Sequence, residues 1–249
     1  MENLQLLINL HKDAQRQGPG SEATTRTAIE LAGLSPEVPI NIVDIGCGTG
    51  ASTLTLARNL NAQITAVDFL PEFLDILQRN AAAQGLSDNV AILEKSMEVL
   101  PFQDGEFDVI WSEGAIYNIG FETGIKKWQR FLKPDGILAV SEITWLTDSR
   151  PVELESFWQQ AYAEIDTASA KTRQLEEHGY TPIGYFVLPQ ECWMDNYYRP
   201  LQKRFDTFLA RQGDSEEARA LVASEKQEIA LYERYKAYYS YGFYIARKR

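Results

Sequence analysis

The residues best suited to chemistry gather in a glycine-rich segment near the start of a predicted sheet. Residues 43–50 read VDIGCGTG, with three glycines at alternate positions directly after a short apolar run. Glycines in such a turn accept positive φ and let a ligand approach the backbone closely. The helix that follows offers unpaired N–H groups to a polar or anionic group. The segment therefore predicts a ligand-binding loop.

Two glutamates follow later strands of the same predicted sheet. Glu113 comes after a predicted strand at residues 107–111, and Glu142 lies near the end of another at residues 137–143. Because ligands bind at the carboxyl ends of parallel strands, we expect both carboxylates near the reacting atoms, where one orients the substrate or takes its proton. A structural role, as a loop cap or as the partner of a Lys or Arg, is the alternative for each.

The elements that must position these residues alternate along residues 40–145. Short apolar runs predict strands, and periodic stretches between them predict helices. The strands are expected at residues 40–44, 64–67, 90–93, 107–111 and 137–143, the helices at 52–59 and 71–83, and a turn at 133–136. This alternation is typical of an α/β, Rossmann-like doubly wound sheet with helices on both faces.

The flanking regions are predicted to be mostly helical. We expect helices at residues 3–17, 21–32, 151–164, 168–177, 194–211 and 215–237, and strands at 183–187 and 241–246, the last of them antiparallel. About fifty residues between the last two strands exceed what a hairpin needs. We interpret residues 1–249 as a single domain: an N-terminal helical cap (1–35), a ligand-binding core (40–145) and a substrate-side half (146–249) with a helical insertion at about 190–238.

The glycine loop by itself fits two classes of ligand. Gly46, Gly48 and Ala51 satisfy a permissive dinucleotide fingerprint, and Asp68 lies near the position of a ribose-binding acid. Asp44, however, places a carboxylate just before the loop, which disfavours a pyrophosphate and favours a ligand that carries positive charge.

Five segments occur in the order and spacing of a known family. They are DIGCGTG at residues 44–50, AVD at 66–68, LPF at 100–102, FDVI at 107–110 and LKPDG at 132–136. Together they resemble the motifs of class I S-adenosylmethionine-dependent methyltransferases, in particular the small-molecule branch that includes the ubiquinone/menaquinone-type enzymes. Beyond residue 150 the resemblance holds only in outline. It implies S-adenosylmethionine as cofactor and in-line methyl transfer to a small-molecule acceptor.

The resemblance also implies a set of cofactor-binding residues. They are Asp44, Gly46, Cys47, Gly48, Gly50, Asp68, Phe69, Ser96, Met97 and Glu113. Asp68 is expected to hold the ribose hydroxyls. One position departs from the branch, which usually has Gly-Asp-Ala before Leu-Pro-Phe; Ser96 stands in place of that Asp and offers adenine only a hydroxyl.

Aromatic side chains are the candidates for the acceptor site. Tyr117 and Trp145 follow the fourth and fifth strands, and Trp193 and Tyr197 lie four residues apart on a predicted helix. Such rings can form a pocket for a cationic amine, or they can simply pack the inserted helices against one another. His11, on the first helix, is expected to be a solvated residue, with a role as base as the alternative.

Composition excludes several other functions. The chain has 24 Lys and Arg against 35 Asp and Glu, a formal charge of −11, which disfavours nucleic acid and anionic membranes. Cys47 and Cys192 are expected to form neither a disulfide nor a structural zinc site, so no metal is predicted. We see no leader and no apolar run of membrane length, so a cytoplasmic enzyme is expected.

Two other functions stay open from the sequence. One is a nicotinamide-dependent oxidoreductase, and the other is a non-catalytic S-adenosylmethionine-binding protein. The sequence does not choose the acceptor, the acceptor atom among C, N, O and S, or the oligomeric state. We also expect Gly46→Val to abolish cofactor binding while the fold stays intact.

Overall fold

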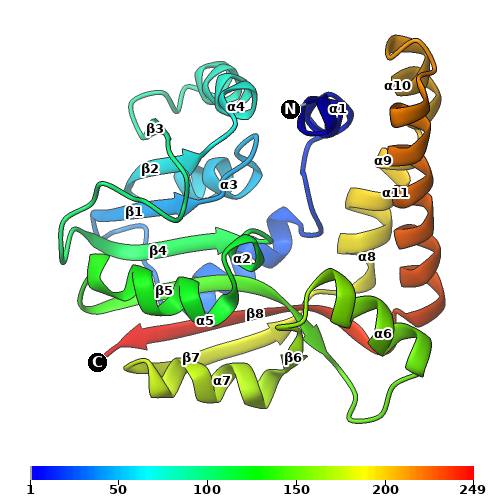
Figure 1. The fold of residues 1–249 in the computed structure, drawn as a ribbon. Helices are drawn as coiled ribbons and strands as arrows, with labels where there is room; N and C mark the ends of the chain where they lie inside the picture. The colour runs from blue at the N-terminus through cyan, green and yellow to red at the C-terminus, as the bar shows by residue number, and fades with distance from the viewer. Residues whose placement is uncertain (1) are drawn as a thin grey trace.

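A mixed β-sheet forms the centre of the computed structural model, which describes residues 2–249 (Figure 1). Its order is β3-β2-β1-β4-β5-β8-β7, with the short β6 paired to β5. The strands are β1 Ile40–Ile45, β2 Ala62–Asp68, β3 Val90–Glu94, β4 Phe107–Glu113, β5 Leu132–Trp145, β6 Asp166–Thr167, β7 Tyr180–Val187 and β8 Tyr239–Lys248. Neighbours from β3 to β5 are parallel, and β8 is antiparallel to both β5 and β7. The predicted Rossmann-like sheet with an antiparallel last strand is confirmed.

Helices cover both faces of this sheet. They are α1 Glu2–His11, α2 Glu22–Leu31, α3 Ala51–Asn59, α4 Pro71–Ala83, α5 Phe121–Trp128, α6 Val152–Ala161, α7 Ala168–Glu177, α8 Gln190–Trp193, α9 Arg199–Gln202, α10 Phe205–Arg211 and α11 Glu216–Tyr235. The 3₁₀ turns are η1 Ile116–Asn118 and η2 Gln129–Phe131, and the π-helical turn is η3 Met194–Tyr198. Helices α2 and α3 pack on one face, and α5 and α7 on the other.

The alternation of side chains along each strand builds a core on both faces. In β1, Ile42 joins the core beneath α2 and α3, while Val43 joins the core beneath α5 and α7. In β4, Trp111 likewise joins the core beneath α2 and α3, and Ile110 joins the core beneath α5 and α7. Successive residues of a strand point to opposite faces, so an unbroken apolar run is what a sheet covered on both sides requires.

The inserted helices stand at the carboxyl end of the parallel strands. Figure 1 shows α8, α9, α10 and α11 as a helical layer beyond the ends of β4 and β5, with α1 between this layer and α4. Helix α1 contacts both α10 and α11. The N-terminal cap and the insertion, far apart in sequence, therefore meet above the sheet edge where ligands bind in such folds.

Three of the elements that the sequence predicted differ clearly in their bounds or continuity. The first helix ends at His11 instead of residue 17, because the following residues cross the glycine loop as described below. The expected turn at residues 133–136 lies inside β5, where Asp135 has φ 62° and the register with β4 shifts. The expected helix 194–211 begins at Gln190 and is interrupted near Pro200, which lacks the N–H that a continuous α-helix needs.

Membrane-spanning helices and clusters of metal-ligating side chains are both absent from residues 2–249. No helix in this range has the length and hydropathy of a membrane span. Within the same range, no three His, Cys, Asp or Glu side chains come together as a metal site would require.

Candidate active site

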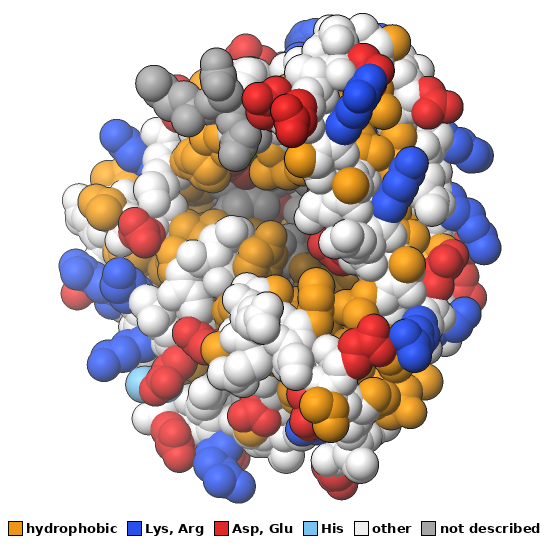
Figure 2. Space-filling model, turned by 45° about the vertical axis from the view of Figure 1, so that its right-hand side comes forward, with side chains coloured by type: hydrophobic (Ala, Val, Ile, Leu, Met, Phe, Trp, Pro, Cys, Tyr) orange, Lys and Arg blue, Asp and Glu red, His pale blue; other side chains and the backbone are white. Residues whose placement is uncertain are grey.

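A cavity of about 500 Å³ lies at the carboxyl ends of β1, β2 and β4. Its walls come from the glycine loop, α1, the residues after α1, the segment after β4, and the helices α6, α8 and α11. Figure 2 shows that this face of the molecule is hollowed and that hydrophobic side chains gather around the opening. A concave, largely apolar space of this size suits a small ligand.

The glycine loop forms the cavity wall at the ends of β1 and β2. Gly46, Gly48 and Gly50 have φ values of 75°, 54° and 90°, the left-handed region that favours glycine. The Gly46 and Cys47 N–H groups donate to the Val67 carbonyl at 2.8 and 3.0 Å, which ties the loop to β2. Of the expected loop residues, Gly46, Cys47 and Gly48 line the cavity.

Gly46 is required by the fold as well as by any ligand. A Cβ on Gly46 would lie 2.3 Å from the Ala115 Cβ, in the segment after β4. Gly50 is also a packing residue, since its Cβ would lie 2.1 Å from the Leu77 Cδ1 of α4. The expectation that Gly46→Val leaves the fold intact is therefore wrong, and Gly50 contacts α4 instead of the cavity.

Asp68 lines the cavity at the end of β2. Its Oδ2 accepts from the Gly48 N–H at 2.9 Å and its Oδ1 from the Leu70 N–H at 3.0 Å. Burial raises the pKa of this carboxyl, and the backbone hydrogen bonds oppose the rise. Phe69, beside it, exposes 54% of its surface and also lines the cavity.

Asp44 does not reach the cavity. Its Oδ2 accepts from the Ser52 hydroxyl at 2.9 Å and from the Thr53 hydroxyl at 2.6 Å, and the residue is fully buried. Burial raises the pKa of Asp44 to about 7, against the lowering effect of these two hydroxyls. The expected direct contact with the cofactor is thus corrected: Asp44 fastens the first turn of α3 to β1.

The segment after β3 contains two residues that were expected to bind the cofactor, Ser96 and Met97. Met97 lines the cavity, whereas Ser96 is exposed, and its hydroxyl accepts from the Glu98 N–H at 3.2 Å. The structure therefore does not place Ser96 where adenine would need it. Lys95, which sequence reasoning passed over, does line the cavity.

Glu113 lines the cavity and holds the N-terminal region. Its carboxylate forms an ion pair with Arg16 and accepts from the Thr25 hydroxyl at 2.7 Å and the Trp111 indole N–H at 3.0 Å. Only 7% of its side chain is exposed. With these three donors, Glu113 anchors the segment after α1 to the end of β4.

Residues 12–20, which we call the strap, cross over the glycine loop. The Gln17 Oε1 accepts from both the N–H and the hydroxyl of Thr49 at 3.0 Å, and a Cβ on Gly48 would lie 2.7 Å from that oxygen. At its far end the Gly20 carbonyl accepts from the Asn196 side-chain amide at 2.9 Å. Sequence reasoning placed residues 12–17 in a helix and did not predict that this segment contacts the glycine loop.

Glu142 is not part of the cavity wall. It is fully buried in β5, 3.3 Å from the Lys171 Nζ of α7, and burial raises its pKa to about 7 against the opposing effect of Lys171. The expectation that Glu142 sits beside the reacting atoms is corrected, because its side chain points to the face of β5 that α7 covers. Trp145 also lies off the cavity, with the Arg150 guanidinium 4.7 Å from its ring centroid.

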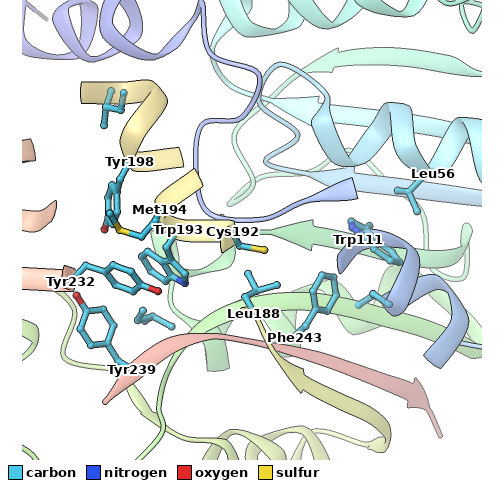
Figure 3. Packing of buried hydrophobic residues seen from close by; sticks show 14 of the residues in the cluster. Leu56, Trp111, Leu188, Cys192, Trp193, Met194, Tyr198, Tyr232, Tyr239 and Phe243 are labelled. Atoms are coloured by element: carbon cyan, nitrogen blue, oxygen red, sulfur yellow. The ribbon is translucent and has the colours of Figure 1, made fainter. Parts of the chain in front are cut away.

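The other three aromatic candidates do line the cavity. Tyr117 follows β4, Trp193 ends α8, and Tyr197 lies in the π-helical turn. Trp193 also packs inside the insertion, stacking on Tyr232 at 4.5 Å between ring centroids, as Figure 3 shows. Its indole N–H donates to the Ser240 hydroxyl at 2.9 Å. The two alternative roles, cavity wall and helix packing, are combined in one side chain.

Further residues complete the wall on the side of the insertion. They are His11, Trp158, Glu225, Glu228 and Tyr241. His11 is buried instead of solvated, with its Nε2 3.6 Å from the Glu225 Oε1. Glu225 and Glu228 belong to a long, charged helix in which acidic residues are ordinary, so the sequence carried no signal that two of them face inward.

The fold and the cavity together define a Rossmann-like protein with a cavity of small-ligand size beside a glycine loop. Residues 42–136, from β1 to the turn within β5, match the family described as "Methyltransferase domain". Over these residues, the match confirms the resemblance to methyltransferases that the motifs predicted.

Curated relatives share the core of the chain. A demethylmenaquinone methyltransferase of Thermus thermophilus is 36% identical over 47% of this chain and 52% of its own length. An ajmaline N-methyltransferase of Rauvolfia serpentina is 36% identical over 64% of this chain and 49% of its own length. The chain spans from 20% to 57% of the length of the first curated relatives.

Solved structures resemble the whole chain in fold. A methyltransferase from Geobacter sulfurreducens, crystallised with S-adenosyl-L-homocysteine, has a TM-score of 0.86 at 19% identity and covers 98% of both chains. One from Thiobacillus denitrificans, also crystallised with S-adenosyl-L-homocysteine, has a TM-score of 0.84 at 19% identity and covers 97% of both. The arrangement of cap, sheet and insertion is therefore shared along nearly the full length.

Proposed function

We propose that this chain is an S-adenosylmethionine-dependent methyltransferase that acts on a small-molecule acceptor. The observation that carries the proposal is the continuous cavity of about 500 Å³, which joins the glycine loop to the aromatic wall of the insertion. One side of this space suits a cofactor, and the other is enclosed by α1, α6, α8 and α11. An enclosed space of this size favours a small acceptor over a macromolecular one.

The residues at the glycine loop fit the cofactor. Asp68 directs a carboxylate to the cavity, and each of its oxygens retains a lone pair beyond its backbone hydrogen bond, as a ribose diol requires. Phe69 and Met97 supply the apolar walls that a purine needs. Arg16 and Glu113 present one charge of each sign, which matches the carboxylate and the ammonium of the amino-acid end.

When bound, S-adenosylmethionine supplies an electrophilic methyl group on a sulfonium whose leaving group is a thioether. The chain itself contributes position and exclusion of water. Helix α1 places Leu4, Leu7 and Ile8 on the cavity, and the strap closes the loop side through Gln17. Holding two reactants in line can account for several kcal/mol of a displacement barrier. An amine or thiolate acceptor therefore needs no strong base at the transfer step, whereas a carbon or hydroxyl acceptor does.

The relatives' names do not choose the acceptor. One is named for demethylmenaquinone and another as an ajmaline N-methyltransferase, so the same core serves more than one acceptor chemistry. The net charge of −11 and two buried free cysteines support the further proposal of a cytoplasmic enzyme that binds neither nucleic acid nor anionic membrane.

A calorimetric titration tests the proposal. We expect S-adenosylmethionine and S-adenosylhomocysteine to bind with one site per chain and NAD not to bind. Binding of NAD alone would favour a nicotinamide-dependent oxidoreductase. Binding of S-adenosylmethionine without methyl transfer to any member of a broad acceptor panel would favour a non-catalytic binding protein.

A further inference from the structure

The wall of the cavity formed by α11 carries two carboxylates that pair with no Lys or Arg among the described residues, and the imidazole nearest to them is that of His11. Glu225 and Glu228 lie on neighbouring turns of the same face and both line the cavity. The Glu228 Oε1 accepts from the Tyr198 hydroxyl at 2.9 Å, and the Glu225 Oε2 is buried with no hydrogen-bond partner among the described residues. Of the Lys and Arg residues in the described part of the wall, Arg16 is already paired with Glu113 and Lys95 follows β3 on the cofactor side.

His11 faces the same space from α1. Only 6% of this residue is exposed, and its Nδ1 has no hydrogen-bond partner among the described residues. Its other nitrogen lies 3.6 Å from the Glu225 Oε1. A buried polar atom left unpaired costs free energy unless a ligand or water satisfies it. The unpaired atoms of His11 and Glu225 therefore mark this end of the cavity wall as polar and not compensated by the described residues.

Aromatic rings surround these acids from five separate elements. Tyr117 comes from η1, Trp158 from α6, Trp193 from α8, Tyr197 from the π-helical turn and Tyr241 from β8. The Trp193 and Tyr241 ring centroids are 5.0 Å apart. Ring faces attract cations, most strongly when water is excluded. Carboxylates and aromatic rings that line one cavity favour a ligand with positive charge.

We propose that the acceptor is a small organic amine that binds as an ammonium cation between Glu225, Glu228 and this aromatic wall, and that the reaction is N-methylation. The inference rests on the proposed methyltransferase function and specifies its substrate class. An acceptor with a carboxylate or phosphate at this end would meet two like charges. A neutral hydroxyl or carbon acceptor would leave both carboxylates buried and uncompensated.

The chemistry balances with groups already present. An ammonium cannot attack, because its nitrogen has no lone pair, so it first gives a proton to a carboxylate, which we assign to Glu228. Burial raises the pKa of Glu228, and the charge of Glu225 adds to the rise, which makes this carboxylate a better proton acceptor. The freed lone pair forms the N–C bond to the donated methyl, the C–S bond breaks, and its electron pair stays on sulfur as the thioether.

Paired probes test the substrate class. The protein saturated with S-adenosylhomocysteine is titrated with butylamine, 2-phenylethylamine and tryptamine, and with the alcohol that corresponds to each amine. We expect at least one amine to bind about tenfold or more tightly than its alcohol, since a charge-assisted contact is worth about that ratio. Equal binding across all pairs, or tighter binding of the alcohols, would overturn the inference.

Variants assign the effect to α11. Glu228→Gln and Glu225→Gln are expected to weaken the favoured amine about tenfold each and to leave its alcohol unchanged. Glu233→Gln removes the same charge from an exposed position of the same helix and is the matched control. Equal weakening in the control, or loss of amine and alcohol binding alike in the two test variants, would count against the assignment.

A failure of the inference is separable from a failure of the proposed function. S-adenosylhomocysteine binding is measured first in every variant and is expected to stay within about twofold of the parent protein, because neither glutamate lies on the glycine loop. If the parent protein does not bind S-adenosylhomocysteine, the methyltransferase proposal falls. If it binds, and methyl transfer goes only to hydroxyl or carbon acceptors, the amine inference alone falls.

Discussion

Gly46 shows how closely one residue of the loop is fixed by its neighbours. It combines φ 75° with a space in which a Cβ would lie 2.3 Å from the Ala115 Cβ. Gly85 has a similar φ of 69° but nothing within 4 Å of the added Cβ. We expect Gly46→Ala to lower the free energy of unfolding by about 2–4 kcal/mol, and Gly85→Ala by only about 1 kcal/mol. Urea denaturation of both variants measures the difference, and equal losses would contradict the packing argument.

Asp44 makes a pH-dependent contribution to stability. Burial raises its pKa from 3.8 to about 7 in the folded chain, so the fold favours the protonated acid. This contribution is fully present below pH 3.8 and is lost as the pH rises through about 7, to a total of about 4 kcal/mol at most. Asp44→Asn removes the titrating group, so this part of the pH dependence of the free energy of unfolding should disappear.

Denaturation of the parent chain and Asp44→Asn from pH 4 to 8, without ligand, gives the test. The stability of the variant relative to the parent should rise with pH over this window and level off above pH 7. A constant difference between the two proteins would mean that Asp44 titrates at the same pH in the folded and unfolded chains.

Residue types located the loop but not which way each side chain points. The glycine pattern predicted the cavity wall at Gly46 and Gly48, which both line the cavity. Asp44 belongs to the same motif, yet its partners are the hydroxyls of Ser52 and Thr53. Glu228 was missed because an acid in a charged helix is indistinguishable from a solvated one until the helix is docked.

At the scale of elements, the strap depends on a buried ion pair. Arg16 and Glu113 are 12% and 7% exposed, whereas the Arg26–Glu22 pair on α2 is 55% and 46% exposed. Arg16→Met should weaken S-adenosylhomocysteine binding about tenfold and speed proteolysis within residues 12–20, because a charge pair out of water contributes more than an exposed one. Arg26→Met should change neither quantity. Unchanged proteolysis in Arg16→Met would show that the strap is held by other contacts.

A second buried pair joins β5 to α7. Glu142 and Lys171 have side-chain exposures of 0% and 1%. Removal of one partner leaves the other charge buried, so Glu142→Gln should lower the free energy of unfolding by about 3–5 kcal/mol. The exposed carboxylate of Glu153 is the control, and Glu153→Gln should cost less than about 1 kcal/mol.

Binding measurements on Glu142→Gln then separate stability from function. Because Glu142 lies off the cavity, the folded variant should bind S-adenosylhomocysteine and the favoured amine as the parent does. A specific loss of amine binding with little loss of stability would restore the catalytic role that the sequence first predicted for this residue.

The sequence predicted elements well where a local pattern forms them. Helix α4 begins at Pro71 and ends at Ala83 as expected, since proline marks its first turn. Helix α5 was missed, because its N-cap residue, Gly120, provides no side-chain capping signal. The bulge at Asp135 and the π-helical turn before Pro200 arise from pairing and packing with distant segments, which no local window contains.

At the scale of the whole molecule, the cavity combines a core that matches the methyltransferase family with walls built from segments outside that match. Residues 42–136, which match the methyltransferase family, supply the glycine loop and the first four strands. Helix α1 and the insertion supply the other walls of the cavity. Sequence reasoning recovered the core because its motifs are local. The walls outside it bring residue 11 beside residue 225, a contact that depends on the complete fold.

The strap also has a consequence for timing. Gln17 and Arg16 bridge the strap to the loop and to β4. Under the proposed function, we expect a spent cofactor to leave only after these contacts break. We expect departure of the thioether product to be slower than the displacement itself. Rapid mixing of the cofactor-loaded protein with an accepted amine should then give a fast first turnover followed by a slower steady rate. Arg16→Met should raise that steady rate. In such an enzyme, the strap that shields the reaction from water also sets the rate of turnover.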